Sequence, residues 1–322
     1  MPLISSTYRP PLGFANGYMQ SIYPTLFRRL ATSHLQHETL ELSDGDFLDL
    51  DWSCGYGKQL VIVSHGLEGH SRRPYVAGVV REANRQGYDA LSWNFRGCSG
   101  RPNRLARSYH SGATEDLAAV IHHAQNQGYQ HVHLVGFSMG GNLSLLYLGR
   151  DSVATAVRSA VAFSVPCDLK ASAEQLAKRR NRIFMWRFLR DLRGKMTEKA
   201  QRFPGQVQVD DFHQIRNFRQ FDDRYTAPLH GFSSALDYWA RSSCLPYLSH
   251  IQHPALLVNA LDDPFLAPSC YPRAIAQSSP WLHLELPAHG GHVGFVERGK
   301  DQVYWMERRA MAFIRQHSPD NK

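Results

Sequence analysis

Residues 131–142 read His131-Val132-His133-Leu134-Val135-Gly136-Phe137-Ser138-Met139-Gly140-Gly141-Asn142, and this stretch decides the fold. An apolar run leads directly into a Gly-x-Ser-x-Gly pattern, and a segment with helical character follows. Such a strand-turn-helix context is typical of a nucleophile elbow. Gly136 and Gly140 leave room for a sharp turn, which would expose the Ser138 hydroxyl at the positive end of the next helix. We therefore predict Ser138 as a nucleophile; the alternative is an ordinary turn serine before a helix.

β-like runs and helical stretches alternate on both sides of this elbow, which indicates an α/β fold with a mostly parallel sheet. The expected strands are residues 35–43, 46–52, 59–64, 89–94, 131–136, 157–165, 254–260 and 281–286. The expected helices are residues 74–87, 113–127, a segment from about 140, and 301–316. Residues 168–245 break the alternation, being helical, basic and aromatic. We expect one α/β-hydrolase domain over residues 1–322, with a helical cap inserted at about 168–245 above the carboxyl ends of the strands.

An unactivated serine is a poor nucleophile and needs a base. In this fold the triad follows the chain order serine, acid, histidine. His289 and His292 both lie in the glycine-rich loop after the last expected strand. We favour His292, because its loop carries two glycines and leads toward the final helix. His289 would then shape the turn.

The acid of the triad should follow the preceding strand, where the sequence reads Leu261-Asp262-Asp263-Pro264. Asp263 is the preferred candidate, since it abuts the proline turn at which the chain leaves the sheet. It would orient the imidazole and stabilise the imidazolium. Asp262, with turn capping as its other role, and Asp168, after an earlier strand, remain alternatives.

Acyl transfer also requires hydrogen-bond donors for the developing oxyanion. The backbone N–H of Met139, directly after the nucleophile, is the first candidate, and the N–H of Leu67, after the strand that ends at His65-Gly66, is the second. Glu68 and His70 in the same loop are predicted to be hydrogen-bond partners within it. The glycine-rich turn at residues 94–100 would support the pocket floor, and Cys98 within it is not expected to be catalytic.

Composition places the chain among ordinary globular proteins, with 322 residues, 43% hydrophobic and 20% charged. No apolar run approaches the roughly 20 residues that span a bilayer, and the N-terminus lacks the pattern of a secretory signal, so we expect a cytoplasmic protein. The five cysteines are widely spaced, which favours reduced thiols. No three-ligand cluster with zinc spacing occurs, so neither a metal nor a cofactor is expected.

The net charge of +8 is concentrated in one segment. Residues 170–202 contain eleven Lys or Arg and three Asp or Glu, which accounts for the whole excess. Apolar residues at 185, 188, 189 and 192 keep helical spacing. This pattern favours a cap helix with its apolar side on the core and its arginines in water. The alternative is a lid that touches anionic lipid or attracts an acidic substrate. No nucleic-acid motif accompanies the charge, so nucleic-acid binding is not expected.

Taken together, the motifs resemble the YheT-like branch of the α/β-hydrolases, which is related to the eukaryotic ABHD1/ABHD3-type hydrolases. The matching runs extend along most of the chain and include residues 14–24 (FANGYMQSIYP), 65–69 (HGLEG), 94–100 (NFRGCSG), 136–142 (GFSMGGN), 262–265 (DDPF) and 289–295 (HGGHVGF). The resemblance implies a serine hydrolase with Ser138, Asp263 and His292 as its triad. It also implies carboxylic esters as substrates, with phospholipids as substrates of the eukaryotic relatives. Those relatives resemble membrane-anchored proteins, whereas this chain has no spanning segment, and Tyr18 stands where the family more often has His.

We therefore expect hydrolysis of a small-molecule carboxylic ester through an acyl-enzyme intermediate. Two enzymatic alternatives share the same triad: acyl transfer to an alcohol or thiol, and cleavage of lipid or phospholipid esters at a membrane surface. A non-enzymatic alternative is a binding protein on a hydrolase scaffold, which a complete triad disfavours.

Overall fold

A nine-stranded mixed sheet forms the centre of the computed structural model, which describes residues 3–32, 34–299 and 301–319. The strand order is β1-β9-β8-β7-β6-β4-β5-β3-β2. β2 (Gln36–Glu41) and β3 (Phe47–Ser53) form an antiparallel hairpin, and β3 pairs antiparallel with β5 (Asp89–Trp93). All other neighbouring pairs are parallel, so the prediction of a mostly parallel sheet is confirmed.

The central strands are buried along their whole length, or nearly so. They are β4 (Leu60–Ser64), β6 (Val132–Phe137), β7 (Val157–Phe163) and β8 (Ala255–Val258). Their continuous apolar runs fit a parallel sheet that is covered on both faces. β9 (Leu282–Glu285) continues the sheet toward the edge strand β1 (Leu3–Ile4).

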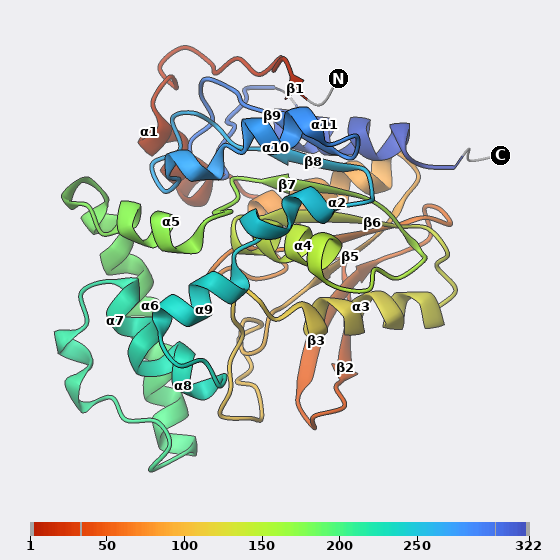
Figure 1. Ribbon diagram of the computed structural model, residues 1–322. Helices are drawn as coiled ribbons and strands as arrows, with labels where there is room; N and C mark the ends of the chain where they lie inside the picture. Colours follow the sequence, from red (N-terminus) through yellow and green to blue (C-terminus); the bar gives the residue numbers. More distant parts are fainter. Residues whose placement is uncertain (1–2, 33, 300, 320–322) are drawn as a thin grey trace.

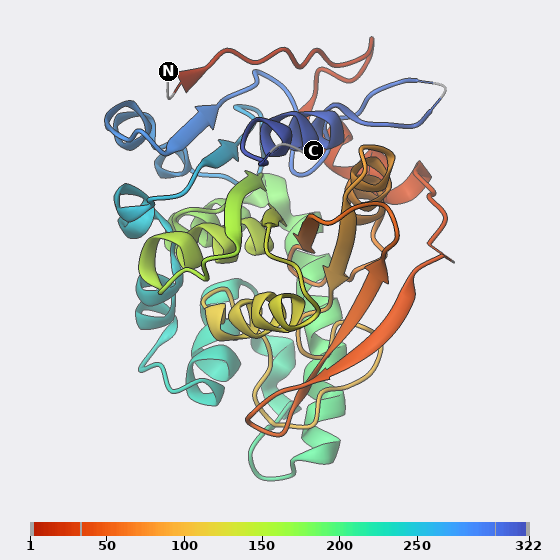
Figure 2. The same ribbon diagram turned by 90° about the vertical axis from the view of Figure 1, so that its right-hand side faces the viewer.

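Helices cover both faces of the sheet (Figures 1 and 2). α2 (Pro74–Arg85) and α11 (Trp305–Gln316) pack on one face. α3 (Thr114–Asn126), α4 (Met139–Arg150) and α10 (Arg273–Ser278) pack on the other face. The layers place the carboxyl ends of the parallel strands, and the loops that follow them, at one edge of the sheet.

Two N-terminal elements were not expected from the sequence. β1 pairs with β9 through Leu3 and Leu284. α1 (Gly17–Phe27) begins after Asn16, whose side chain accepts hydrogen bonds from the amides of Tyr18 and Met19. Residue preferences do not predict α1, because it begins with a glycine and contains Pro24, and both residues are unfavourable in a helix.

Between β7 and β8 the chain is helical, and we call residues 168–245 the cap. Its helices are α5 (Leu169–Leu176), α6 (Arg182–Arg202), α7 (Phe218–Phe221), α8 (Ala227–Leu229) and α9 (Ala235–Ser242), and a π-helical turn, η3 (Asp222–Thr226), joins α7 to α8. In Figure 1 these helices lie to one side of the sheet. The cap contains an apolar cluster of its own.

The long helix α6 buries Met185, Leu189, Leu192 and Met196, which are three or four residues apart and therefore share one face. Arginines at positions 182, 187, 190 and 193 are exposed. The helical spacing read from the sequence is thus the buried stripe of a cap helix, and most of its basic residues lie in water.

Candidate active site

Ser138 lies at the turn between β6 and α4, with φ +52° and ψ −117°. A non-glycine residue in this region is strained and persists only where its surroundings hold it. The Ser138 amide donates to the Phe163 carbonyl at 2.8 Å, and the Ser138 carbonyl accepts from the Asn142 amide at 2.9 Å. A Cβ at Gly136 or Gly140 would collide with backbone atoms of the turn or of the neighbouring loop, so both glycines are required for its tightness.

A continuous hydrogen-bonded chain connects Ser138 to a histidine and a carboxylate. His292 Nε2 lies 2.9 Å from Ser138 Oγ. His292 Nδ1 lies 2.9 Å from Asp263 Oδ2 and 3.2 Å from Oδ1. The Asp263 side chain is fully buried, and Oδ1 also accepts the Phe265 amide at 2.9 Å. The three side chains therefore have the spacing that proton transfer from a serine to an oriented imidazole requires.

The alternative site residues are not part of the hydrogen-bonded series that joins Ser138, His292 and Asp263. Asp262 is 3.3 Å from His289 Nδ1 and accepts the Gly291 amide at 2.9 Å, so it supports the histidine loop. Asp168 caps α5 by accepting the Ala171 amide at 3.0 Å. The structure brings together Ser138, Asp263 and His292, and it gives His289, Asp262 and Asp168 other partners.

Two backbone amides beside Ser138 have no acceptor among the described residues. They belong to Leu67 and Met139, and both residues line the same cavity as Ser138. Buried N–H groups are rarely left unpaired, so two of them next to a nucleophile are available to a ligand oxygen. Gly66 makes the approach close, since a Cβ there would lie 3.1 Å from Ser138 Cβ.

The Gly66–Leu67 peptide is anchored by its carbonyl. The Gly66 oxygen lies 2.7 Å from His65 Nδ1 and accepts the Gly69 amide at 2.9 Å. His65 Nε2 accepts the Phe95 amide at 3.2 Å, so Nδ1 carries the proton and donates. Burial lowers the pKa of His65 to about 3, which keeps the ring neutral. The turn at residues 94–100 thus supports the loop at residues 65–69 through the hydrogen bond from the Phe95 amide to His65.

The comparison with protein families gives a match to the alpha/beta hydrolase fold over residues 59–299. The chain belongs to this family. "Putative esterase YheT" of Escherichia coli (strain K12) is 36% identical over 299 residues, which cover 91% of this chain and 88% of that protein. "Phospholipase ABHD3" of Homo sapiens is 29% identical over 307 residues, which cover 92% of this chain and 75% of that protein.

Solved structures show the same fold. The esterase Pf2001 of Pyrococcus furiosus superposes with a TM-score of 0.60 at 15% identity, covering 96% of this chain and 99% of that chain. Within the part of the chain that the structure describes, no helix is both long and apolar enough to cross a membrane. No group of three or more His, Cys, Asp or Glu side chains among those residues could hold a metal ion.

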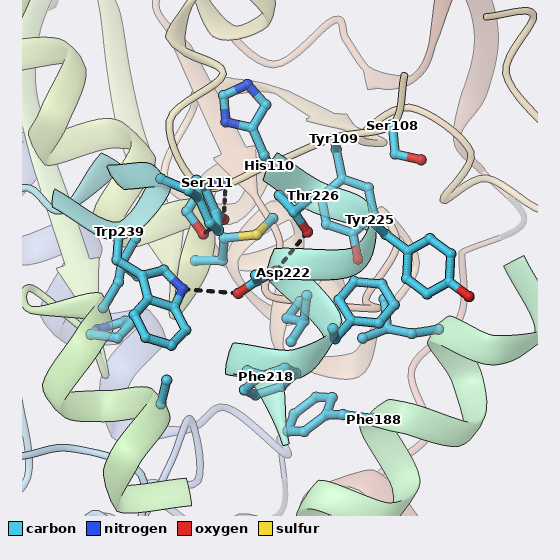
Figure 3. A pocket seen from close by; sticks show the side chains of 18 of the residues that line it. Ser108, Tyr109, His110, Ser111, Phe188, Phe218, Asp222, Tyr225, Thr226 and Trp239 are labelled. Atoms are coloured by element: carbon cyan, nitrogen blue, oxygen red, sulfur yellow. Dashed lines mark hydrogen bonds between the residues drawn. The ribbon is translucent and has the colours of Figure 1, made fainter. Parts of the chain in front are cut away.

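A cavity extends from Ser138 and His292 of this hydrolase fold to the side of the cap that faces them. Figure 3 shows part of its lining, around Asp222 and Trp239. Its walls come from α5, α6, α7, η3, α9 and residues 108–111. Most of the wall is apolar or aromatic, and includes Leu169, Leu176, Phe188, Leu192, Met196, Phe218, Phe221, Tyr225 and Trp239. A second opening from Ser138 lies between α1 and α6 and is lined by Ser21, Pro24, Thr25, Phe184 and Arg187.

Two basic residues of α6 point inward rather than into water, and Lys199, whose Nζ donates to Asn103 Oδ1 and to the carbonyls of Leu105 and Arg107, is one of them. Lys195 Nζ on α6 lies 3.0 Å from Glu68 Oε1 and 3.0 Å from Cys98 Sγ. Glu68 also accepts a hydrogen bond from the Tyr109 hydroxyl. Sequence reasoning assigned Glu68 to its own loop and did not separate Lys195 from the exposed arginines. The contact ties the cap to the residue next to Leu67.

Proposed function

We propose that the protein is a serine esterase that hydrolyses carboxylic esters in two steps. The observation that carries the proposal is the unbroken hydrogen-bonded chain from Ser138 Oγ through His292 to Asp263. Ser138 attacks the ester carbonyl, and His292 Nε2 accepts its proton and returns it to the leaving alcohol. Water then attacks the acyl-enzyme with His292 again as base. Asp263 holds Nδ1–H and stabilises the imidazolium.

The amides of Leu67 and Met139 bind the oxyanion in both steps of this proposal. They are free of protein acceptors and fixed by the elbow and by the anchored Gly66 carbonyl, so they need no reorganisation when charge develops. Two relatives carry the names esterase and phospholipase, which supports ester cleavage as the reaction class.

The test is covalent labelling by a fluorophosphonate probe, followed by hydrolysis of para-nitrophenyl esters of increasing acyl length. We expect the wild type to be labelled and to release para-nitrophenol, and Ser138→Ala to do neither. Ser152→Ala, at an exposed position in the loop after α4, is the matched control and should behave as the wild type. An unlabelled, inactive wild type would contradict the proposal and leave a binding protein on a hydrolase scaffold. Products formed with an added alcohol separate hydrolysis from acyl transfer.

We also propose that the second opening faces anionic lipid surfaces. Ile183 and Trp186 on α6 are 69% and 62% exposed, and exposed arginines surround them. On α1, which borders the opening through Ser21, Pro24 and Thr25, Leu26 and Phe27 are 53% and 66% exposed. Apolar side chains among cationic ones are the composition of helices that rest in a lipid interface. An ester held in such a surface would enter beside Ser138.

Vesicle co-sedimentation tests this contact. We expect pelleting with anionic vesicles that is stronger at low than at high salt, and none with purely zwitterionic vesicles. Trp186→Ser should weaken pelleting, whereas Tyr56→Ser, which removes another exposed aromatic side chain from the β3–β4 loop, should not. Equal pelleting by both variants, or none by the wild type, would contradict the lipid proposal without touching the esterase proposal.

A further inference from the structure

A carboxyl group stands in the wall of the catalytic cavity, on the cap side. Asp222 begins the π-helical turn η3 and lines the same cavity as Ser138 and His292 (Figure 3). Its Oδ1 accepts the Thr226 hydroxyl at 2.6 Å, and its Oδ2 accepts the Trp239 indole N–H at 2.8 Å. The residue is 8% exposed. The reaction proposed above makes no use of this group.

In the described part of the chain, Asp222 has no cationic partner. Both of its hydrogen-bond donors are neutral, and among the described residues no Lys, Arg or His forms an ion pair with it. Burial, with the nearby charge of Asp223 adding to it, raises the pKa of Asp222 to about 7. Asp223 differs, because it faces outward and lies 3.8 Å from Arg219. An ionised carboxylate that is buried without a cation is costly, so Asp222 is poised to gain from a ligand that supplies one.

The geometry leaves room on Asp222 for such a ligand. A carboxylate offers about four acceptor positions, and the protein fills two of them. The other charged side chain in the cavity wall, Lys195, is already paired with Glu68. Aromatic rings stand in the same wall, including Trp239 itself, and ring faces attract cations. If Asp222 only linked η3 to α9, an uncharged side-chain oxygen could accept the same hydrogen bonds.

We propose that Asp222 forms a selectivity subsite for esters whose cavity-bound arm carries a hydrogen-bond donor, an ammonium or a hydroxyl, away from the ester bond. This inference deepens the esterase proposal and rests on it for the position of the reacting carbonyl. An ammonium gains from the charge of Asp222 and from the rings, and a hydroxyl gains from one hydrogen bond. An alkyl end of the same length gains neither.

Kinetics with matched esters test the subsite. Para-nitrophenyl esters with acyl chains of increasing length would end in methyl, hydroxymethyl or aminomethyl groups, with uncatalysed hydrolysis subtracted. We expect one chain length at which the amino ester exceeds the methyl ester in kcat/KM by about 10-fold or more at pH 8, as a hydrogen bond to a charged group implies. The hydroxyl ester should lie between them. That chain length measures the span from Ser138 to Asp222.

Binding to Ser138→Ala protein separates this proposal from the esterase proposal. Amides serve as ligands that resemble the ester: alkanamides with the same three end groups vary the acyl arm, and N-alkylacetamides vary the alcohol arm. Calorimetry measures their binding without any hydrolysis. An ammonium preference in a protein that fails the fluorophosphonate test would uphold the subsite and contradict the esterase. Protein that is labelled and active but shows no ammonium preference in either series would uphold the esterase proposal and contradict the subsite.

Asp222→Asn and Asp223→Asn form the matched pair of variants. Asp222→Asn should reduce the amino-to-methyl ratio to within about twofold of one, and Asp223→Asn should leave it unchanged. A preference that survives in folded Asp222→Asn protein would overturn the assignment.

If Asp222→Asn does not fold, the wild-type pH profile decides. The amino-to-methyl ratio should rise between pH 6 and 8 as Asp222 ionises. Other groups of the wall do not titrate there, because burial lowers the pKa of His110 and His230 and raises the pKa of Tyr225 and Tyr238. Burial also raises the pKa of Tyr109, whereas for Lys195 burial lowers the pKa but the adjacent Cys98 and Glu68 outweigh it, so that the pKa is raised. His292 acts on all esters alike, and a flat ratio would contradict the proposal.

Discussion

Replacing Asp263 with asparagine should abolish the proposed esterase activity while preserving the fold. The Phe265 amide donates to Oδ1 at 2.9 Å, so the new side chain keeps its carbonyl oxygen at that position. Its amino group then occupies the Oδ2 position, 2.9 Å from His292 Nδ1. Two N–H donors cannot face each other, so Nδ1 must become the acceptor. The proton moves to Nε2, which then cannot accept the proton of Ser138.

The expected loss follows from this change of tautomer. A triad whose histidine is held in the wrong tautomer loses on the order of 10⁴-fold in kcat, or about 5.4 kcal/mol of transition-state stabilisation. The free energy of unfolding should change by far less, because asparagine has the same shape and keeps the Phe265 contact. Hydrolysis of a para-nitrophenyl ester gives kcat, and thermal unfolding checks the fold.

Two controls make the prediction specific. Asp262→Asn and Asp168→Asn each keep an amide oxygen that can accept the hydrogen bonds from Gly291 and Ala171. We therefore expect both to retain kcat within about tenfold of the wild type, since neither touches His292. Folded Asp263→Asn that retains more than a tenth of the activity would contradict the expected change of tautomer, and so would an equally large loss in Asp262→Asn.

Three further predictions concern the cap and the buried histidines. Gly194→Ala, at an exposed site in α6 where a new Cβ meets nothing within 4 Å, should raise the free energy of unfolding in urea by about 0.5–1 kcal/mol without changing kcat. Lys195→Met removes the cation from the nearly buried Glu68 beside Leu67 and leaves it with the Tyr109 hydroxyl. It should lower kcat by less than the roughly 100-fold cost of deleting an oxyanion donor, and Lys195→Arg should recover part of that loss. Burial lowers the pKa of His65 and His133 to about 3, so below pH 6.5 the unfolded chain binds two protons that the folded chain does not. These two histidines alone should make the free energy of unfolding fall by up to about 2.7 kcal/mol for each unit by which the pH is lowered between 6 and 4, and a urea midpoint that stays constant over that range would contradict this.

The parts of the molecule that could be predicted from the sequence are those whose physical cause lies within a short stretch of residues. Continuous apolar runs such as residues 59–64 indicate buried parallel strands, and the glycines around Ser138 indicate the sharp turn. The pairing of Asp263 with His292 could be proposed because both follow strands of one sheet, whose carboxyl ends meet at one edge. In each case a short window contains the physical cause.

Features that depend on distant partners could not be predicted in this way. β1 is two residues long and exists as a strand only because Leu3 lies beside Leu284. Lys195 lies among arginines that point into water, and nothing in its neighbourhood distinguishes it until α6 is laid against Glu68. Asp222 resembles any acidic residue near a helix start, and its burial is decided by Trp239 on α9.

The cap joins the two halves of the proposed chemistry. Its inner wall, with Asp222 and the aromatic residues, surrounds the arm of the ester that extends away from Ser138. The same cap contributes Lys195, which holds Glu68 next to the Leu67 amide that would stabilise the oxyanion. Binding energy gained in the cavity can therefore bear on the geometry in which the transition state forms. Changes at Asp222 should act mainly on KM, whereas changes at Lys195 should act on kcat, although both residues line the same cavity and belong to one inserted segment.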